Sequence, residues 1–251
     1  VSLKLSADRS TVGSIFAEGP TVRGTVKSLD PPAGMLTLAV QEGKQHVDKS
    51  FNVKNASVSI IDAAGKDSKS KVLDQKLADL PVGAVATLRL SPSQEVLSVS
   101  AEGPTVSGTV KRVDAAAKRI ALTVAVKGEP ERELEFELAG DVRVTIDGAG
   151  DRTLGDLPTG AGVTLRLSAD QKSVRSIDAE GPSVQGTATI VDSSSRSITI
   201  TDKVGSNIYQ VAKDAQVTID GKSSEFSHVP VGAIIRARLS ADRSTVRSIS
   251  A

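Results

Sequence analysis

One fourteen-residue segment occurs three times in this chain, and the repetition constrains the fold more than any other feature. It reads AEGPTVRGTVKSLD over residues 17–30, AEGPTVSGTVKRVD over residues 101–114 and AEGPSVQGTATIVD over residues 179–192. Successive copies start 84 and 78 residues apart. Small differences in repeat length are typical of loops, so the sequence predicts tandem modules of similar structure.

The segments between these copies are typical of β-strands. In residues 36–40 and 87–90 apolar and polar residues alternate, as in antiparallel strands with one buried face. The core must come from Val, Leu, Ile and Ala, because the chain has four Phe, one Tyr and no Trp. Such residues in short runs favour strands. At most one helical turn is expected in each repeat, the first near residues 77–80.

The predicted fold class is therefore all-β, with three tandem small antiparallel β-barrel or β-sandwich modules in a linear array. Five to six strands in about 75 residues suit a small barrel or sandwich. The expected boundaries are an N-terminal hairpin over residues 1–17 and modules over residues 18–101, 102–179 and 180–251. Each module is expected to close with a hairpin, with polar turns over residues 168–173 and 240–245.

The Glu-Gly-Pro of the repeat lies where one module ends and the next begins. Gly can take a positive φ and Pro has no N–H for a sheet, so this tripeptide is expected to end pairing and redirect the chain. The Asp-Gly pairs at residues 147–148 and 220–221 predict tight hairpin turns. Other Asp residues recur near turns and are expected to accept hydrogen bonds from local backbone rather than to bind calcium. They are Asp8, Asp30, Asp114, Asp170, Asp192 and Asp242.

Residues with site chemistry are scarce. The chain has no Cys, and its two His residues, His46 and His228, are expected in loops without catalytic partners. The Ser-x-x-Lys match from Ser68 to Lys71 is interpreted as chance, because a Lys/Asp/Ser-rich insertion over residues 63–75 surrounds it. The net charge of +1 and the few aromatic residues argue against nucleic-acid binding. We therefore predict a non-enzyme with no cofactor, metal, small-molecule substrate or nucleic-acid partner, and with no membrane insertion.

Several strings of the repeat resemble a known kind of module. They are V-x-G-T-V-x-x-V-D, V-T-I-D-G, L-x-D-L-P-x-G-A-x-V-T-L-R-L-S-A-D and S-I-x-A-E-G-P. Together they are similar to small OB-like β-barrel repeat modules of unknown function in large bacterial multidomain proteins. The resemblance covers nearly the whole chain and implies a barrel-like module and a bacterial source. Its motifs are turn and core signals, so it implies no catalytic residue.

Two functions follow as hypotheses. The first is a structural repeat protein, a spacer or fibre-forming array in an extracellular or cell-surface location. The second is a protein-binding scaffold or sensor region of a larger bacterial protein, which is compatible with a cytoplasmic location. A binder should gather its least repeat-like residues on one face, whereas a spacer should scatter them over loops. The insertion over residues 63–75 is the candidate special surface.

The N-terminal hairpin carries the predicted assembly contacts. Residues 1–17 match the closing hairpin at residues 235–251, and no module stands before them in this sequence. A hairpin alone is marginally stable in water, so its apolar residues are expected to be covered. One hypothesis is head-to-tail association of copies by β-strand addition. The other is a chain cut from a longer array, whose end frays. The predicted contact residues are Val1, Leu3, Leu5, Val12, Ile15 and Phe16.

Overall fold

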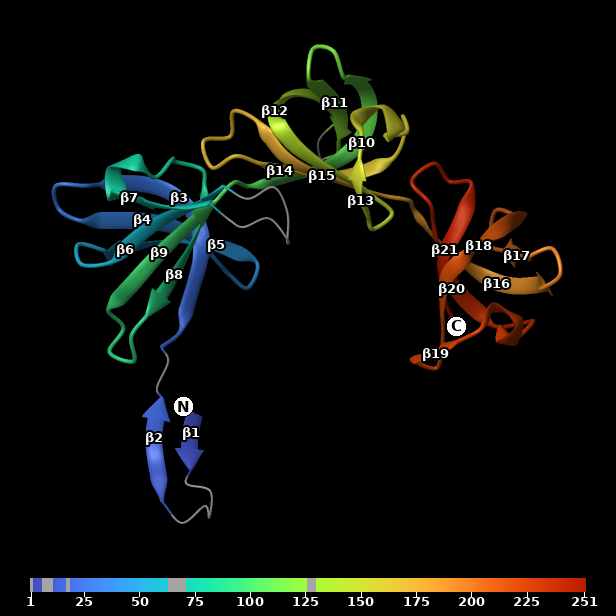
Figure 1. The fold of residues 1–251 in the computed structure, drawn as a ribbon, viewed down its shortest axis with the longest axis horizontal. Helices are drawn as coiled ribbons and strands as arrows, with labels where there is room; N and C mark the ends of the chain where they lie inside the picture. The colour runs from blue at the N-terminus through green and yellow to red at the C-terminus, as the bar shows by residue number, and fades with distance from the viewer. Residues whose placement is uncertain (1, 6–10, 17–18, 63–70, 126–129) are drawn as a thin grey trace. The chain divides into compact units, whose positions relative to one another are not determined.

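The computed structural model describes residues 2–5, 11–16, 19–62, 71–125 and 130–251. Over these residues the secondary structure is β-strand with three short 3-10 turns, so the prediction of an all-β chain of tandem modules is confirmed (Figure 1). Strands β1 (Ser2–Leu5) and β2 (Val12–Phe16) pair with each other as the predicted N-terminal hairpin. The remaining strands form three larger sheets.

The first sheet has the strand order β5-β4-β3-β8-β9-β6-β7. Its strands are β3 (Thr21–Asp30), β4 (Met35–Glu42), β5 (Gln45–Asn52), β6 (Ser57–Asp62), β7 (Lys71–Gln75), β8 (Val85–Leu90) and β9 (Val96–Glu102). Among the described residues its strands pair antiparallel, except β6 and β9, which pair in parallel. The parallel pair is a detail that the alternation of apolar residues does not predict.

The second and third sheets share one topology. The second has the order β11-β10-β14-β15-β12-β13, and an added β11–β12 pairing closes five of its strands into a ring. Its strands are β10 (Thr105–Asp114), β11 (Arg119–Val124), β12 (Arg132–Ile146), β13 (Ala149–Arg152), β14 (Gly162–Leu167) and β15 (Val174–Glu180).

The third sheet repeats this arrangement with the order β17-β16-β20-β21-β18-β19 and a closing β17–β18 pairing. Strand β18 pairs in parallel with β21. Its strands are β16 (Ser183–Asp192), β17 (Ser197–Thr201), β18 (Ser206–Ile219), β19 (Lys222–Ser224), β20 (Ile234–Leu239) and β21 (Thr245–Ser250).

A single strand in the later sheets corresponds to two strands in the first. Strand β12 runs continuously, whereas β5 and β6 are separated by a turn at residues 53–56. In that turn the N–H of Ala56 donates to the carbonyl of Val53 at 3.0 Å, and the side chain of Asn52 accepts from the N–H of Lys54 at 3.1 Å. These local bonds replace ladder bonds and interrupt the strand.

Each sheet buries one apolar face, as the alternating pattern predicts. Leu36 and Leu38 on β4 and Leu88 on β8 have no exposed area, and they belong to one hydrophobic cluster of the first sheet. Ile198 on β17 and Ile249 on β21 have the equivalent role in the third. The core contains few aromatic side chains and is filled by branched aliphatic residues and Ala.

The single helical turns are confirmed at the expected positions. They are η1 (Leu77–Asp79), η2 (Leu154–Asp156) and η3 (Phe226–His228). At η2 the N–H and hydroxyl of Thr153 donate to Asp156, which lowers the pKa of that carboxyl from its ordinary value. The module boundaries given by the sequence stay a prediction.

The first-repeat insertion is shorter than predicted. Lys71 to Gln75 form strand β7, which pairs with β6 just as β13 pairs with β12 and β19 with β18. These residues therefore belong to the repeated framework. Ser68 and residues 63–70 as a whole lie outside the described residues.

Candidate functional site

The glycine of Glu-Gly-Pro is required by a close backbone approach. A Cβ atom on Gly103 would lie 1.8 Å from the carbonyl oxygen of Leu167, and one on Gly181 would lie 2.1 Å from that of Ser240. Neither glycine has a positive φ. The expectation that this glycine serves a left-handed backbone is therefore wrong, and its role is to leave space for the following hairpin.

The proline and glutamate of the motif also bind the closing hairpin of the module that follows. The carbonyl of Pro104 accepts the N–H of Leu167 at 3.0 Å, and the carbonyl of Pro182 accepts that of Leu239 at 2.9 Å. The carboxylate of Glu102 lies 2.7 Å from Arg166. Glu180 and Arg238 form the corresponding ion pair at 2.8 Å. In these two modules Glu-Gly-Pro thus contacts the closing hairpin at the end of its first strand, β14 or β20.

The closing hairpins of the second and third sheets end in turns of the same internal structure, which we call docking turns (residues 168–173 and 240–245). In the second of these, the N–H of Ser240 donates to the carbonyl of Thr245 at 2.7 Å, and its hydroxyl donates to Asp242. The Ser240 hydroxyl lowers the pKa of Asp242, and Ser168 has the same effect on the pKa of Asp170. Asp242 also accepts the N–H of Ser244 at 3.0 Å, as predicted for turn carboxylates.

The docking turn at residues 240–245 lies on the second sheet. The N–H of Ala241 donates to both carboxylate oxygens of Asp147, at 2.9 and 3.1 Å. The guanidinium of Arg243 donates to the carbonyl of Gly160 at 3.1 Å. Ala241 is 2% exposed although it stands in a polar turn. We call the Asp147 carboxylate and the Gly160 carbonyl the acceptor site of the second sheet.

The docking turn at residues 168–173 lies on the first sheet in a similar way. Ala169 is 6% exposed and belongs to the hydrophobic cluster of that sheet. The side-chain amide of Gln171 donates to the carbonyl of Val82 at 3.1 Å. Val82 and Gly160 stand in equivalent loops, Pro81-Val-Gly83 of the first module and Pro158-Thr-Gly160 of the second, at adjacent positions of the Pro-x-Gly pattern. By contact density, residues 166–175 form one compact unit with residues 1–105, and residues 106–165 with 176–251.

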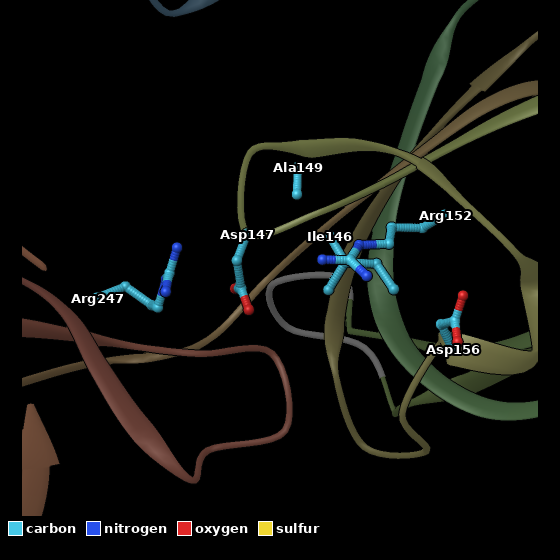
Figure 2. A pocket seen from close by; sticks show the side chains of 6 residues that line it. All are labelled: Ile146, Asp147, Ala149, Arg152, Asp156 and Arg247. Atoms are coloured by element: carbon cyan, nitrogen blue, oxygen red, sulfur yellow. The ribbon is translucent and has the colours of Figure 1, made fainter. Parts of the chain in front are cut away.

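A pocket borders the carboxylate of Asp147. Figure 2 shows the six residues that line it, which are Ile146, Asp147, Ala149, Arg152, Asp156 and Arg247. Arg247 is held by Asp214, with two N–H donations of 2.9 and 3.0 Å to its carboxylate oxygens. The lining holds two carboxylates, Asp147 and Asp156, and two guanidinium groups, Arg152 and Arg247. The pocket is lined mainly by charged side chains and lies beside the hydrogen bond from the Ala241 N–H to Asp147.

The predicted assembly residues lie on the N-terminal hairpin. Leu3 on β1 is opposite Ile15 on β2, and Leu5 is opposite Val12, so the register brings apolar residues together across the pair. Phe16 is opposite Ser2. Val1 lies outside the described residues. Their role in association stays a prediction.

The other residues that the sequence singles out have local roles. The prediction that His46 lies in a loop is wrong, because His46 stands on strand β5 opposite Gln41. The Nδ1 of His228 lies 3.4 Å from the hydroxyl of Ser224. Asp30 and Asp114 each accept a backbone N–H three residues further on, at 3.1 and 2.8 Å. Asp8 lies outside the described residues. Where the structure describes the chain, no cluster of three or more His, Cys, Asp or Glu could hold a metal ion.

The three sheets differ in polarity at one place on the outer surface, where three residues from adjacent strands lie side by side. On the third sheet Ile190 and Ile208 flank Thr199 across three adjacent strands, and they are 59% and 73% exposed. The corresponding residues of the second sheet, Arg112 and Glu135, form an ion pair at 3.3 Å across Ala121. The first sheet has Ser28, Thr37 and Ser50 in these places. An apolar patch therefore occurs at a position that is polar in the other two sheets.

The docking contacts were not predicted from the sequence, although a signal for them exists. Both docking turns and the N-terminal hairpin read Ser-Ala-Asp, and an Ala repeated inside a polar turn is a sign of burial. The corresponding first-sheet turn reads Ser91-Pro-Ser and departs from this pattern.

In the described residues no helix is both long and apolar enough to span a membrane. Protein-family models give no match to this chain, and no curated protein is significantly similar to it in sequence.

Proposed function

We propose that this chain is a non-catalytic structural repeat protein, a spacer or fibre-forming array in which each β module is joined to its neighbour by a docking turn. One observation carries the proposal: the same joint is built twice. In both cases an Ala is buried in a turn and the side chain two residues later donates to a Pro-x-Gly loop. A contact of the same kind that recurs along the chain is what a spacer of repeated modules requires.

The joint is more specific than a flexible linker. The Ala241 N–H faces a carboxylate, and hydrogen bonds to charged groups contribute about 1.5–3 kcal/mol. The neighbouring Glu180–Arg238 pair is exposed and adds at most about 1 kcal/mol. We propose that the Asp147 contact, rather than the ion pair, is what holds the second and third modules in one orientation. Within this proposal, OB-like identity is supported by the five-strand rings of the second and third sheets.

The orientation can be measured with two spin labels, because the chain has no Cys to compete for labelling. Exposed Ala116 and Lys203 are replaced by Cys, one on the second sheet's first turn and one on the third sheet's β17–β18 turn. The native chain should give a narrow distance distribution by pulsed electron paramagnetic resonance. Asp147→Gly should broaden it, because glycine keeps the positive φ of 52° but removes the carboxylate.

The matched control is Asp220→Gly, which changes the same turn of the third sheet at a φ of 50°. It should leave the distribution narrow. A broad distribution in the native chain, or an unchanged one in Asp147→Gly, would contradict the joint. A fibre or spacer role goes with an extracellular or cell-surface location, and we propose that location with cytoplasmic as the alternative.

A second candidate function is a protein-binding scaffold, and the patch of Ile190 and Ile208 favours it. These residues are the kind of module-specific apolar surface that a binder presents. A photo-crosslinking amino acid at position 190 or 208 should then capture one defined protein in the producing cell. The same residue at position 112 or 135, on the equivalent face of the second sheet, is the control. Equal capture from both faces would remove this candidate.

A further inference from the structure

The outer face of strands β16, β17 and β18 in the third sheet has an uncharged centre (Figure 1). The register places two rows of outward residues across these strands. The first row is Ile190, Thr199 and Ile208, and the second is Thr187, Thr201 and Ser206. Thr189 is the extra residue of the β16 bulge beside them. We call these seven residues the uncharged face.

The same seven positions carry charges in the other two sheets. In the second sheet they include two ion pairs, Lys111 with Glu133 and Arg112 with Glu135. In the first sheet they include one, Lys27 with Asp48. The strand pairing at these positions is the same in all three sheets. The third sheet therefore differs in having lost every charge there, and not in its backbone.

The hydroxyl groups of the uncharged face bond to one another. The Oγ1 atoms of Thr189 and Thr201 are 3.2 Å apart, and the Oγ1 of Thr201 lies 2.7 Å from the Oγ of Ser206. These bonds cross the three strands where the second sheet has its Lys111–Glu133 ion pair. Hydroxyls that keep a hydrogen bond are less costly to remove from water than unpaired ones. The face is thus suited to burial although it is rich in Thr.

Three isoleucines supply the apolar area. Ile190 and Ile208 are 59% and 73% exposed, while Thr199 between them is 9% exposed, so the two isoleucines cover the threonine. Ile234 on β20 stands opposite Thr187 and is 71% exposed, which extends the apolar surface to a fourth strand. Adjacent apolar side chains that water surrounds are typical of interaction sites.

We propose that the uncharged face of one copy packs on the uncharged face of a second copy. A partner must bring no charge to the centre of this contact, because a charge buried there would meet no counter-charge. The same face of a second copy meets this requirement, whereas the equivalent faces of the first and second sheets do not. Identical faces form an isologous contact, which by itself closes at a dimer.

This inference rests on the second candidate function, in which the patch of Ile190 and Ile208 binds a protein, and it names the chain itself as that protein. The area sets the strength. Four strands about 4.8 Å apart and about four residues of each, at about 3.4 Å per residue, give a face of roughly 270 Å². Two such faces bury less than the roughly 1,200 Å² of stable complexes. We therefore expect a weak dimer that forms at high protein concentration.

Sedimentation velocity of the full chain up to about 1 mM tests the contact, because this range suits weak interfaces. The weight-average mass of the native chain should rise with concentration. The test variant is Ile190→Arg with Ile208→Glu, which copies the Arg112–Glu135 ion pair of the second sheet. It should weaken association at least tenfold. Its circular dichroism should stay native, because the second sheet holds Arg and Glu at these strand positions.

The matched control is Leu97→Arg with Val231→Glu. These two residues are 53% and 66% exposed and lie outside the uncharged face, so the control introduces the same charges elsewhere. It should associate as the native chain does. A second measurement locates the contact by nuclear magnetic resonance. On dilution from about 1 mM, the amide signals of residues 190, 199 and 208 should shift, and those of residues 112 and 135 should not.

A native chain that stays monomeric at this concentration overturns the inference. Unchanged association in the test variant, an equal loss in the control, or amide shifts confined to other residues would do the same. The photo-crosslinking experiment separates these results from the second candidate function. If position 208 captures a different protein in the cell while the pure chain stays monomeric, the binding function stands and the contact between copies does not.

Discussion

At the scale of single residues, the repeated Glu-Gly-Pro is explained by three different contacts. Glu180 pairs with Arg238, Gly181 leaves room for two backbone carbonyls, and Pro182 supplies a carbonyl to Leu239. Of these the glycine is the least replaceable, because the atoms that a side chain would meet belong to backbone. Backbone inside a paired hairpin cannot move away without breaking ladder bonds.

Gly181→Ala is accordingly expected to destabilise the third module. The new Cβ would lie 2.1 Å from the carbonyl of Ser240 and 2.2 Å from that of Leu239. Overpacking of this kind costs about 1–3 kcal/mol or more. Gly150→Ala is the control, since a Cβ there meets nothing within 4 Å and the φ is not positive. Urea unfolding measures both, and a Gly181→Ala midpoint equal to that of Gly150→Ala would refute the close approach.

At the scale of elements, the sequence predicted what depends on local pattern. The alternation in residues 36–40 placed β4 correctly, and the Asp-Gly pairs at 147–148 and 220–221 form turns with two positive φ values each. Both features are determined within a few residues of the chain. Strand pairing over long distances is not, so the parallel β18–β21 pair was not predicted.

The candidate site was predicted less well than the fold, for the same reason. Asp147 was interpreted as an ordinary turn residue, and its bond to Ala241 joins positions 94 residues apart. No local pattern contains such a contact. The repeated Ser-Ala-Asp could have indicated this contact. An exposed Ala does not stabilise a polar turn, so an Ala that recurs there indicates that it is buried. Strand β7 was likewise assigned to an insertion. Only its pairing with β6 makes it part of the sheet, and that pairing cannot be seen in the local sequence.

At the scale of the whole chain, the docking turns imply that neighbouring modules stabilise each other. In repeat proteins, stability is approximately the sum of each repeat's own stability and the interface terms between neighbours. Here the interface between the second and third sheets includes a charge-assisted bond from Ala241 to Asp147. The third module should therefore lose stability when a residue of the second module is changed.

Tyr209 makes this coupling measurable. It is the chain's one Tyr, there is no Trp, and its side chain packs against the core of the third sheet. Its fluorescence therefore reports unfolding of the third module, while circular dichroism reports all three. Asp147→Gly should lower the urea midpoint of the Tyr209 transition. The expected loss in the free energy of unfolding is about 1.5–3 kcal/mol, the typical contribution of a hydrogen bond to a charged group.

The control for this shift is Asp151→Gly, a change on the same second sheet at a similar φ of 58°. Asp151 is exposed, and its substitution should affect only the module that contains it. The Tyr209 transition should then stay at its native midpoint. If Asp147→Gly also leaves that midpoint unchanged, the modules are independent and the docking turn contributes no coupling. If both variants move it equally, the second module acts through its overall stability and not through the carboxylate that Ala241 contacts.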